Sequence, residues 1–263
     1  MSVKTRVATA APLIAGFLAA LYLAPPGPWI GLTALIMMIG AAEWAALTGL
    51  GRFHALLYAT LLGAVSLVLA VGAPDLALPF YGSLAFWLLV PVLLARGVAL
   101  RGTALQLALG ALVLIPTHLA IVTLRAESPH LVLAVVALVA IADSAAYFSG
   151  RRFGKHKLAP SISPGKTWEG ALGALAAVTA YGLGLHFVAP TDCGPACLPV
   201  MLAAFWVLFV LSVVGDLFES TLKRQAGVKD SGTLLPGHGG ILDRIDSLTA
   251  VLPAAALFWI WWK

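Results

Sequence analysis

Residues 220 to 246 read STLKRQAGVKDSGTLLPGHGGILDRID, the longest polar run in a chain of 263 residues that is 61% hydrophobic and 10% charged. With the two acids just before it, this run holds five of the eleven carboxylates of the chain. The rest of the sequence consists mostly of long apolar segments, and charged groups are costly inside a membrane. We therefore predict an all-α polytopic integral membrane protein whose working site is built around this stretch.

Two helix ends joined by a glycine-rich loop are the expected structure of this stretch. At about 100° per residue, four polar side chains before the loop share one face of a helix. They are Asp216, Glu219, Ser220 and Lys223. Residues 236 to 240, PGHGG, end that helix, and successive glycines let backbone N–H groups converge on an anion. A second helix is expected from about Gly240, with Asp243, Asp246 and Ser247 on one face and its positive dipole end toward the loop.

The mixture of acids, bases and glycines predicts a phosphate site bridged by a metal ion. Carboxylates repel phosphates unless a cation lies between them, and Mg²⁺ is commonly bound by carboxylates together with substrate phosphates. The alternative is a charged loop at the membrane surface that is held by salt bridges.

Nine apolar segments approach or reach the length of about 20 residues that crosses a bilayer. They are 8–24, 29–50, 55–73, 76–95, 104–123, 131–149, 170–188, 199–217 and 248–262. If the N-terminus is cytoplasmic, fourteen of the sixteen Lys and Arg residues fall on the cytoplasmic side, and only Arg125 and Lys263 fall outside. The positive-inside rule therefore favours nine spans with an extracytoplasmic C-terminus.

This topology places two polar segments, 150–169 and 218–247, as loops on the cytoplasmic side, where a nucleotide would be available. We expect a single membrane domain over 1–263, with N-terminal helices in 1–130 and catalytic helices in 131–263. The polar features gather in the second half of the chain. An inverted-repeat transporter would instead show paired broken helices in both halves.

A few polar residues lie inside the apolar segments. Asp143 is near the cytoplasmic end of its helix, and we interpret it as a site residue rather than a packing hydrogen-bonder. Glu43 is expected to make an internal polar contact rather than to act in catalysis. Thr117 and His118 are expected to pack.

Residues 165 to 167, Gly-Lys-Thr, resemble the end of a P-loop. The P-loop glycine five residues earlier is replaced by Pro160, and we expect no preceding strand, so a Walker A motif is excluded. The segment is still basic and bears a glycine, which fits contact of Lys166 with anionic membrane lipid.

The two cysteines, Cys193 and Cys197, form a C-x3-C pattern in one predicted outer loop. This spacing is weak evidence for a metal site. A local disulfide is expected if the loop faces an oxidising compartment, and two unpaired thiols are the alternative.

The polar stretch resembles the signature of the phosphatidate cytidylyltransferases, also called CDP-diacylglycerol synthases. The matching pattern over residues 220 to 246 is S-x2-K-R-x4-K-D-x-G-x3-P-G-H-G-G-x2-D-R-x-D. Two upstream segments also resemble that family: D-x3-Y-x2-G-R-x2-G-K from residue 143, and SPGKTWEG from residue 163. The first 130 residues match in general character only.

The resemblance implies a reaction in which CTP and phosphatidic acid give CDP-diacylglycerol and pyrophosphate, with Mg²⁺ as cofactor. Asp216, Lys223, Asp243 and Asp246 are the expected catalytic residues, and the three aspartates are the expected Mg²⁺ ligands. The expected substrate-binding residues are Asp143, Lys166, Ser220, Arg224, Lys229, His238, Gly239, Gly240 and Arg244. A general base is not needed, because a lipid phosphate whose second pKa is near ~6 is already largely ionised. His238 is therefore expected to hydrogen-bond a phosphate or orient the loop.

The resemblance also suggests a homodimer in a lipid bilayer, and no nucleic acid partner is expected. The expected location is a bacterial inner membrane, with the active site facing the cytoplasm. Three alternatives stay open: a transporter for an anionic solute, a scaffold that binds lipid without catalysis, and a related cytidylyltransferase that uses a different lipid phosphate.

Overall fold

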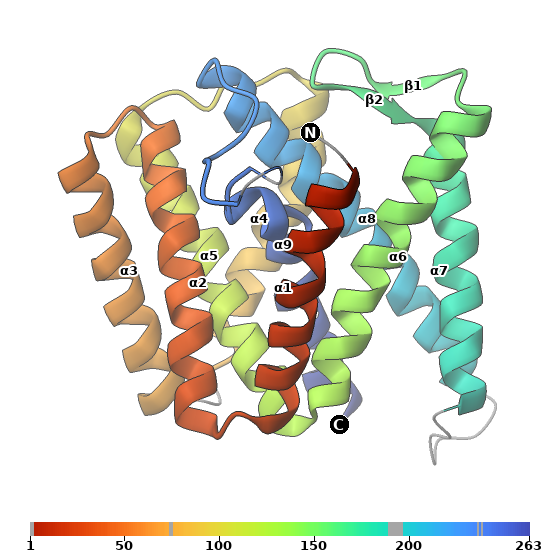
Figure 1. Ribbon diagram of the computed structural model, residues 1–263, viewed down its shortest axis with the longest axis horizontal. Coiled ribbons are helices and arrows are strands. Elements are labelled where there is room, and N and C mark those ends of the chain that lie inside the picture. Colours follow the sequence, from red (N-terminus) through yellow and green to blue (C-terminus); the bar gives the residue numbers. More distant parts are fainter. Residues whose placement is uncertain (1–2, 74–75, 189–196, 236, 238) are drawn as a thin grey trace.

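The computed structural model describes residues 3–73, 76–188, 197–235, 237 and 239–263, with side chains from residue 11 onward. These residues form nine α-helices and one β-hairpin (Figure 1). The helices are α1 (Val3–Leu23), α2 (Pro26–Leu47), α3 (Arg52–Gly72), α4 (Leu78–Ala95), α5 (Thr103–Glu127), α6 (Pro129–Phe153), α7 (Trp168–Val188), α8 (Cys197–Gln225) and α9 (Leu242–Trp262). Eight of these helices are long and apolar enough to cross a membrane, and α1 adds a shorter apolar stretch over Ala11–Leu23. The expected all-α membrane fold is confirmed.

Helices α8 and α9 extend beyond their predicted membrane spans, to Gln225 and from Leu242. The helix expected through Lys223 and the helix expected from about Gly240 are thereby confirmed, and hydropathy detects only the apolar part of each. The segment before α7 is a hairpin of β1 (Lys157–Ala159) and β2 (Ser163–Thr167), so the Gly-Lys-Thr segment lies in a strand. The expectation that no strand precedes this segment was wrong, because hydropathy says little about polar segments.

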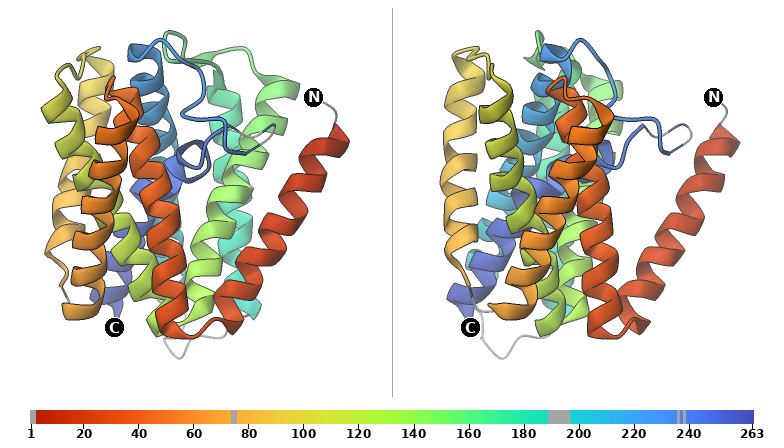
Figure 2. Two further views of the ribbon diagram at one scale, coloured as in Figure 1. Left: turned by 60° about the vertical axis from the view of Figure 1, so that its left-hand side comes forward. Right: turned by 90° about the vertical axis from the view of Figure 1, so that its left-hand side faces the viewer.

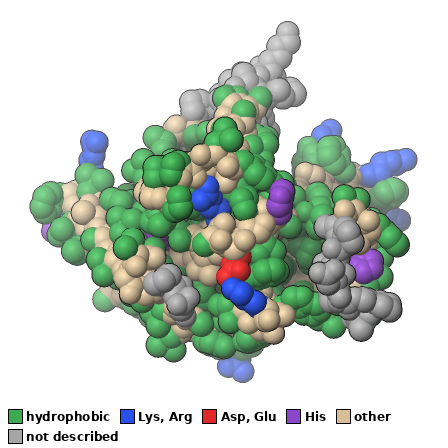
Figure 3. Space-filling model, turned by 90° about the horizontal axis from the view of Figure 1, so that it is seen from below, with side chains coloured by type: hydrophobic (Ala, Val, Ile, Leu, Met, Phe, Trp, Pro, Cys, Tyr) green, Lys and Arg blue, Asp and Glu red, His purple; other side chains and the backbone are tan. Residues whose placement is uncertain are grey.

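The polar segments gather at one end of the bundle. The β-hairpin and the loop between α8 and α9 lie at that end, and the chain termini lie at opposite ends (Figure 1). Figure 3 views the other end, where hydrophobic and uncharged groups dominate. Its described charges include Lys263, which pairs with Glu127.

Helix α9 runs through the middle of the bundle, and 56% of its most apolar 18-residue segment is buried. It packs against α8, α5 and α4. Gly215 of α8 makes the first of these contacts very close: a Cβ at this position would lie 2.8 Å from the carbonyl oxygen of Asp246. Small residues allow such close helix approach in membranes. Here the approach brings the polar ends of α8 and α9 together.

An aromatic cluster supports α8 from the side facing the first half of the chain. The ring of Phe218, which is almost fully buried, lies 5.3 Å from Phe86, 5.5 Å from Trp87 and 6.2 Å from Trp44 between ring centroids. The contacts with Phe86 and Trp87 are edge-on, and such contacts add roughly 0.5–1.5 kcal/mol beyond area burial. The cluster anchors the helix turn that carries Glu219 and Lys223.

The predicted orientation can be measured directly. We expect reporters fused at Lys155 and Lys229 to be cytoplasmic and a reporter after Lys263 to be extracytoplasmic, because the positive-inside rule assigns the basic loops to the cytoplasm. Alkaline phosphatase and green fluorescent protein fusions at these positions give opposite readouts on the two sides. A cytoplasmic reporter after Lys263 would overturn the predicted nine crossings.

Candidate functional site

Helix α8 ends in a glycine cap that turns the chain back toward the bundle. Val228 N–H donates to the Lys223 carbonyl (2.9 Å) and Gly227 N–H to the Arg224 carbonyl (3.1 Å), with Gly227 at a φ of +73°. This is the Schellman arrangement, in which glycine takes the left-handed position without a Cβ penalty. The cap directs the following loop back over α8 and α9.

Lys223 occupies the centre of a buried charge network. Its ammonium lies 2.8 Å from Glu219 Oε2 on the same helix and 2.6 Å from Asp243 Oδ1 on α9. The side chains are only 10% exposed for Lys223, 3% for Glu219 and 4% for Asp243. Buried charges are tolerated when they are paired, so the network ties α8 to α9.

Asp243 also holds the glycine-rich loop in place. Its Oδ2 accepts hydrogen bonds from Ser231 N–H (2.9 Å), Ser231 Oγ–H (3.0 Å) and Gly240 N–H (2.8 Å). Both of its oxygens are therefore occupied by donors from the protein. This position makes Asp243 the organiser of the loop between α8 and α9.

A second ion pair lies nearer the surface. Lys166 of β2 approaches Asp216 of α8 at 2.7 Å, with side chains 24% and 29% exposed. The other oxygen of Asp216 accepts a hydrogen bond from Ser220 one turn further along α8 (3.2 Å). A pair that solvent reaches in this way can exchange partners, so Lys166 and Asp216 are available to a charged ligand.

Three more charged residues join this pair. Asp143 on α6 is exposed, and it lies within electrostatic range of Asp216, Lys166 and Arg244. Asp246 on α9 lies within range of Asp216 and Glu219. Four elements far apart in the sequence, α6, β2, α8 and α9, thus bring eight of the predicted site residues to one place. These eight are Asp143, Lys166, Asp216, Ser220, Lys223, Asp243, Arg244 and Asp246.

The other predicted residues have different positions. Arg224 is exposed and donates to the Val228 carbonyl (3.1 Å), so it supports the cap of α8. Lys229 is exposed and joins none of these contacts in the part of the chain that the structure describes. Gly239, at a φ of +79°, pairs with Leu235 across the loop.

Two predictions concern residues outside the described part of the chain. His238 lies outside it, so its role stays a prediction. Cys193 also lies outside it, so the expected cysteine pair stays a prediction.

Glu43 reaches this site from the first half of the chain. It accepts hydrogen bonds from the backbone N–H of Ile241 (3.1 Å) and Leu242 (2.8 Å), and it shares the single O–H of Ser231 with Asp243, at 3.0 Å from the Ser231 Oγ in each case. The first two donors form the N-terminus of α9, where a carboxylate is favoured by the helix dipole. Gly240 fits here because a Cβ would collide with the Glu43 carboxylate. The expected internal polar contact of Glu43 is thus found.

Three contributors to the site were not predicted as such: Glu43, Glu219 and Ser231. The sequence did indicate Glu43, because a lone acid in an apolar span is a functional residue by default. Glu219 stands on the predicted polar face of α8, one turn before Lys223. Ser231 carried no signal, because only the folded loop reveals that it donates twice to Asp243.

The contacts of Glu43 lead to a testable expectation. All its partners are donors, so Glu43→Gln would turn an amide N–H₂ toward donor groups and lose charge-assisted bonds worth roughly 1.5–3 kcal/mol each. We expect Glu43→Gln to lower thermal stability in detergent, and Glu43→Asp to retain more of it. Glu127→Gln, at the other end of the bundle, is the matched control. Equal stability of Glu43→Gln and wild type would show that the cap contributes little.

The described residues contain no group of three or more Asp, Glu, His or Cys side chains that could hold a metal ion by itself. Asp216 and Asp246 nevertheless lie in mutual electrostatic range. Glu219 lies beside Asp246, and their carboxyl groups share a hydrogen bond. Asp216 and Asp246 fit a cation that arrives with a phosphate ligand, since Mg²⁺ takes one or two carboxylates plus substrate oxygens.

Comparison with known proteins shows the family of the chain. The sequence profile described as the Cytidylyltransferase family matches residues 4–261. The chain belongs to this family. It is 42% identical to the phosphatidate cytidylyltransferase of Pseudomonas aeruginosa, over 97% of both proteins. It is 36% identical to the phosphatidate cytidylyltransferase of Haemophilus influenzae, over 97% of this chain and 98% of that protein.

Similarity within the cytidylyltransferase family is denser over part of the chain. The phosphatidate cytidylyltransferase of Brucella suis is 49% identical over 140 residues, which cover 52% of this chain. The profile match extends through the first 130 residues, where the sequence alone showed only a general resemblance. In this chain, the first 130 residues include Glu43 and the three aromatic residues that pack against Phe218 of α8.

Proposed function

We propose that this chain transfers a cytidylyl group from CTP to phosphatidic acid, giving CDP-diacylglycerol and pyrophosphate. One observation carries the proposal: an accessible lysine–aspartate pair, Lys166 and Asp216, beside a buried network around Lys223, at one end of a membrane bundle. The proposal is also supported by the family of the chain and by relatives named phosphatidate cytidylyltransferase over nearly its whole length.

Two cations, Lys166 and Arg244, would meet the substrate phosphates. Lys166 lies in the hairpin and pairs with Asp216, and Arg244 is exposed on the first turn of α9 within range of Asp143. We infer that a substrate phosphate replaces Asp216 as the partner of Lys166. Lys223 is buried between two carboxylates, so it holds the framework rather than a substrate.

The carboxylates fit a Mg²⁺ site completed by substrate. Asp216 and Asp246 would hold the ion, with Asp143 nearby, while Asp243 keeps its oxygens on the loop donors. Bound Mg²⁺ would offset the negative charge of the phosphates and of the departing pyrophosphate.

The reaction is an in-line phosphoryl transfer. A phosphate oxygen of the lipid attacks the α-phosphorus of CTP, the bond from that phosphorus to the bridging oxygen breaks, and pyrophosphate leaves with the bonding electrons. The chain supplies position and charge: Lys166 and Arg244 orient phosphates, and the network around Lys223 fixes the distance between α8 and α9. No proton has to be removed from a nucleophile that is already ionised.

The setting of the reaction belongs to the same proposal. The site would face the cytoplasm of a bacterial inner membrane, where CTP is available. A homodimer is proposed from the resemblance to the family, and no nucleic acid takes part.

A comparison of substrates tests the proposed lipid. Purified protein in detergent is supplied with CTP and Mg²⁺ and with phosphatidic acid, a polyprenyl phosphate or an archaeal-type lipid phosphate in parallel. We expect a CDP-lipid from phosphatidic acid at the highest rate. Preference for another lipid phosphate would replace the substrate, and anion flux in proteoliposomes without nucleotide turnover would favour a transporter.

A further inference from the structure

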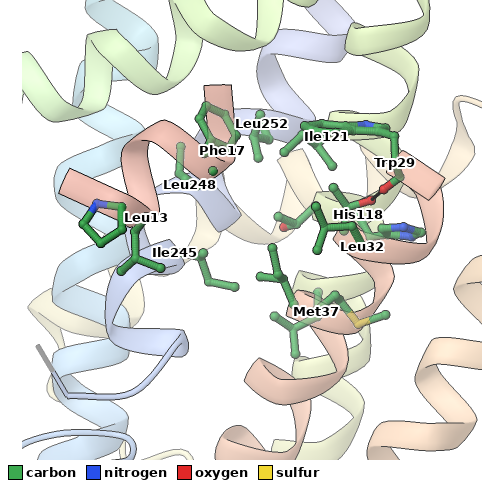
Figure 4. A pocket seen from close by; sticks show the side chains of 16 residues that line it. Leu13, Phe17, Trp29, Leu32, Met37, His118, Ile121, Ile245, Leu248 and Leu252 are labelled. Atoms are coloured by element: carbon green, nitrogen blue, oxygen red, sulfur yellow. Dashed lines mark hydrogen bonds between the residues drawn. The ribbon is translucent and has the colours of Figure 1, made fainter. Parts of the chain in front are cut away.

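An apolar cavity of about 380 Å³ lies between α1, α2, α5 and α9, below the polar site. Leu13 and Phe17 of α1, Leu32 of α2 and Leu248 and Leu252 of α9 point toward it (Figure 4). None of the predicted site residues lines this space. Its size falls within the range typical of small-molecule sites, which is roughly 300–1,000 Å³.

The wall of the cavity is mostly hydrocarbon, and it also contains the polar side chains of Thr33, Thr117 and His118. His118 contacts Ser66 Oγ through Nδ1 and the Ile30 carbonyl through Nε2. Thr117 donates to the Val113 carbonyl and Thr33 to the Trp29 carbonyl. These three side chains have their partners in the protein, and among the described lining residues Trp29 adds one indole N–H without a partner. A single donor cannot replace the hydration that a polar ligand would lose. The wall therefore favours an apolar ligand.

Helix α9 links this cavity to the polar site. Arg244, Leu248 and Leu252 follow one another at i, i+4 and i+8, so they descend along the same side of the helix. Arg244 is exposed at the upper end, within electrostatic range of Asp143, and it makes no ion pair with a described residue. The two leucines below it line the cavity. A cation above an apolar pocket matches a molecule with an anionic head and a hydrocarbon tail.

The position of α1 gives such a molecule access from the bilayer. Its C-terminal end is tied to the bundle: Arg125 donates to the carbonyls of Leu21 and Ala24, and Tyr22 contacts His130. Toward its N-terminus, α1 leans away from the other helices, on the side where the loops of the site lie (Figure 2). Helix α1 and the bundle thus diverge toward the end that carries the polar site (Figure 2).

We propose that this cavity binds one acyl chain of the phosphatidic acid substrate, with the lipid phosphate beside Arg244. The inference rests on the proposed function and adds the place of the lipid tail to it. Burying methylene groups is favourable for each group added, so the cavity should make lipid recognition depend on chain length.

Filling the cavity tests this assignment. We expect Leu248→Trp to raise KM for dioleoyl phosphatidic acid about tenfold or more, while KM for CTP and kcat/KM for dibutanoyl phosphatidic acid stay within about twofold. Leu35→Trp, on the outward side of α2 and outside the cavity, is the matched control and should change none of these values. Equal losses for both lipids with Leu248→Trp would overturn the proposal.

A labelling experiment on wild-type protein gives a second measurement that does not depend on a variant folding. Phosphatidic acid with a diazirine at the chain terminus should crosslink to Leu13, Leu32 or Leu248, and unlabelled phosphatidic acid should compete. Phosphatidylcholine with the same probe should label only the outer surface. Crosslinks confined to that surface, or equal cavity labelling by both lipids, would overturn the inference. Absence of CDP-lipid formation by wild type would instead contradict the proposed function.

Discussion

Asp216→Asn is expected to form CDP-diacylglycerol at least about a thousand times more slowly than wild type, since a divalent cation supplies several kcal/mol of charge stabilisation. Asp216 pairs with Lys166, accepts from Ser220 and lies within range of Asp246. The asparagine has nearly the same shape but no charge. It would therefore leave the fold intact while removing both a metal ligand and the partner of Lys166.

Turnover measured against Mg²⁺ concentration, with EDTA as the zero point, checks this expectation. Asp246→Asn should behave similarly, and Glu127→Gln should match wild type because Glu127 lies at the other end of the bundle. Wild-type rates and metal dependence in both aspartate variants, or full activity in EDTA, would make these acids structural.

Lys223→Met is expected to lower the free energy of unfolding by roughly 3–5 kcal/mol, because removing one partner of a buried ion pair leaves the other charge uncompensated. Here two carboxylates, Glu219 and Asp243, would lose their shared cation. Asp243 would then hold the loop less firmly, and turnover should fall with stability. Removing a carboxylate as well, in Lys223→Met with Glu219→Gln, should restore part of the stability.

Thermal unfolding in detergent measures this effect. Lys229→Met is the control, since this lysine is exposed and joins none of these contacts among the described residues, so the variant should stay within about 0.5 kcal/mol of wild type. If Lys223 instead contacted substrate directly, Lys223→Met would lower turnover and leave stability unchanged.

Much of this fold could be predicted from hydropathy and charge. Apolar segments give the helices, and the shared face of Asp216, Glu219, Ser220 and Lys223 was readable from the helical period. The hairpin around Lys166 was not, because its short strands carry no alternating pattern. The extension of α8 to Gln225 was missed as a span because its last turns are polar.

The gathering of these residues at one end of the bundle could be predicted from the sequence, but the contacts between them could not. Spacing placed the residues near one end of the bundle, yet it could not show that Lys166 would pair with Asp216 or that Asp243 would have both oxygens occupied. Glu43 shows the limit most clearly, since its partner Ile241 lies 198 residues further along the chain. Which side chain caps α9 is decided by the packing of α2 against it, and a local pattern does not contain that information.

The most direct measurement is the stoichiometry of products made by the purified wild-type protein from CTP, phosphatidic acid and Mg²⁺. CDP-diacylglycerol and pyrophosphate should appear in equal amounts, and both should disappear in EDTA and in Asp216→Asn. Folded protein that releases neither product, or that releases pyrophosphate without a CDP-lipid, would contradict cytidylyl transfer at this site.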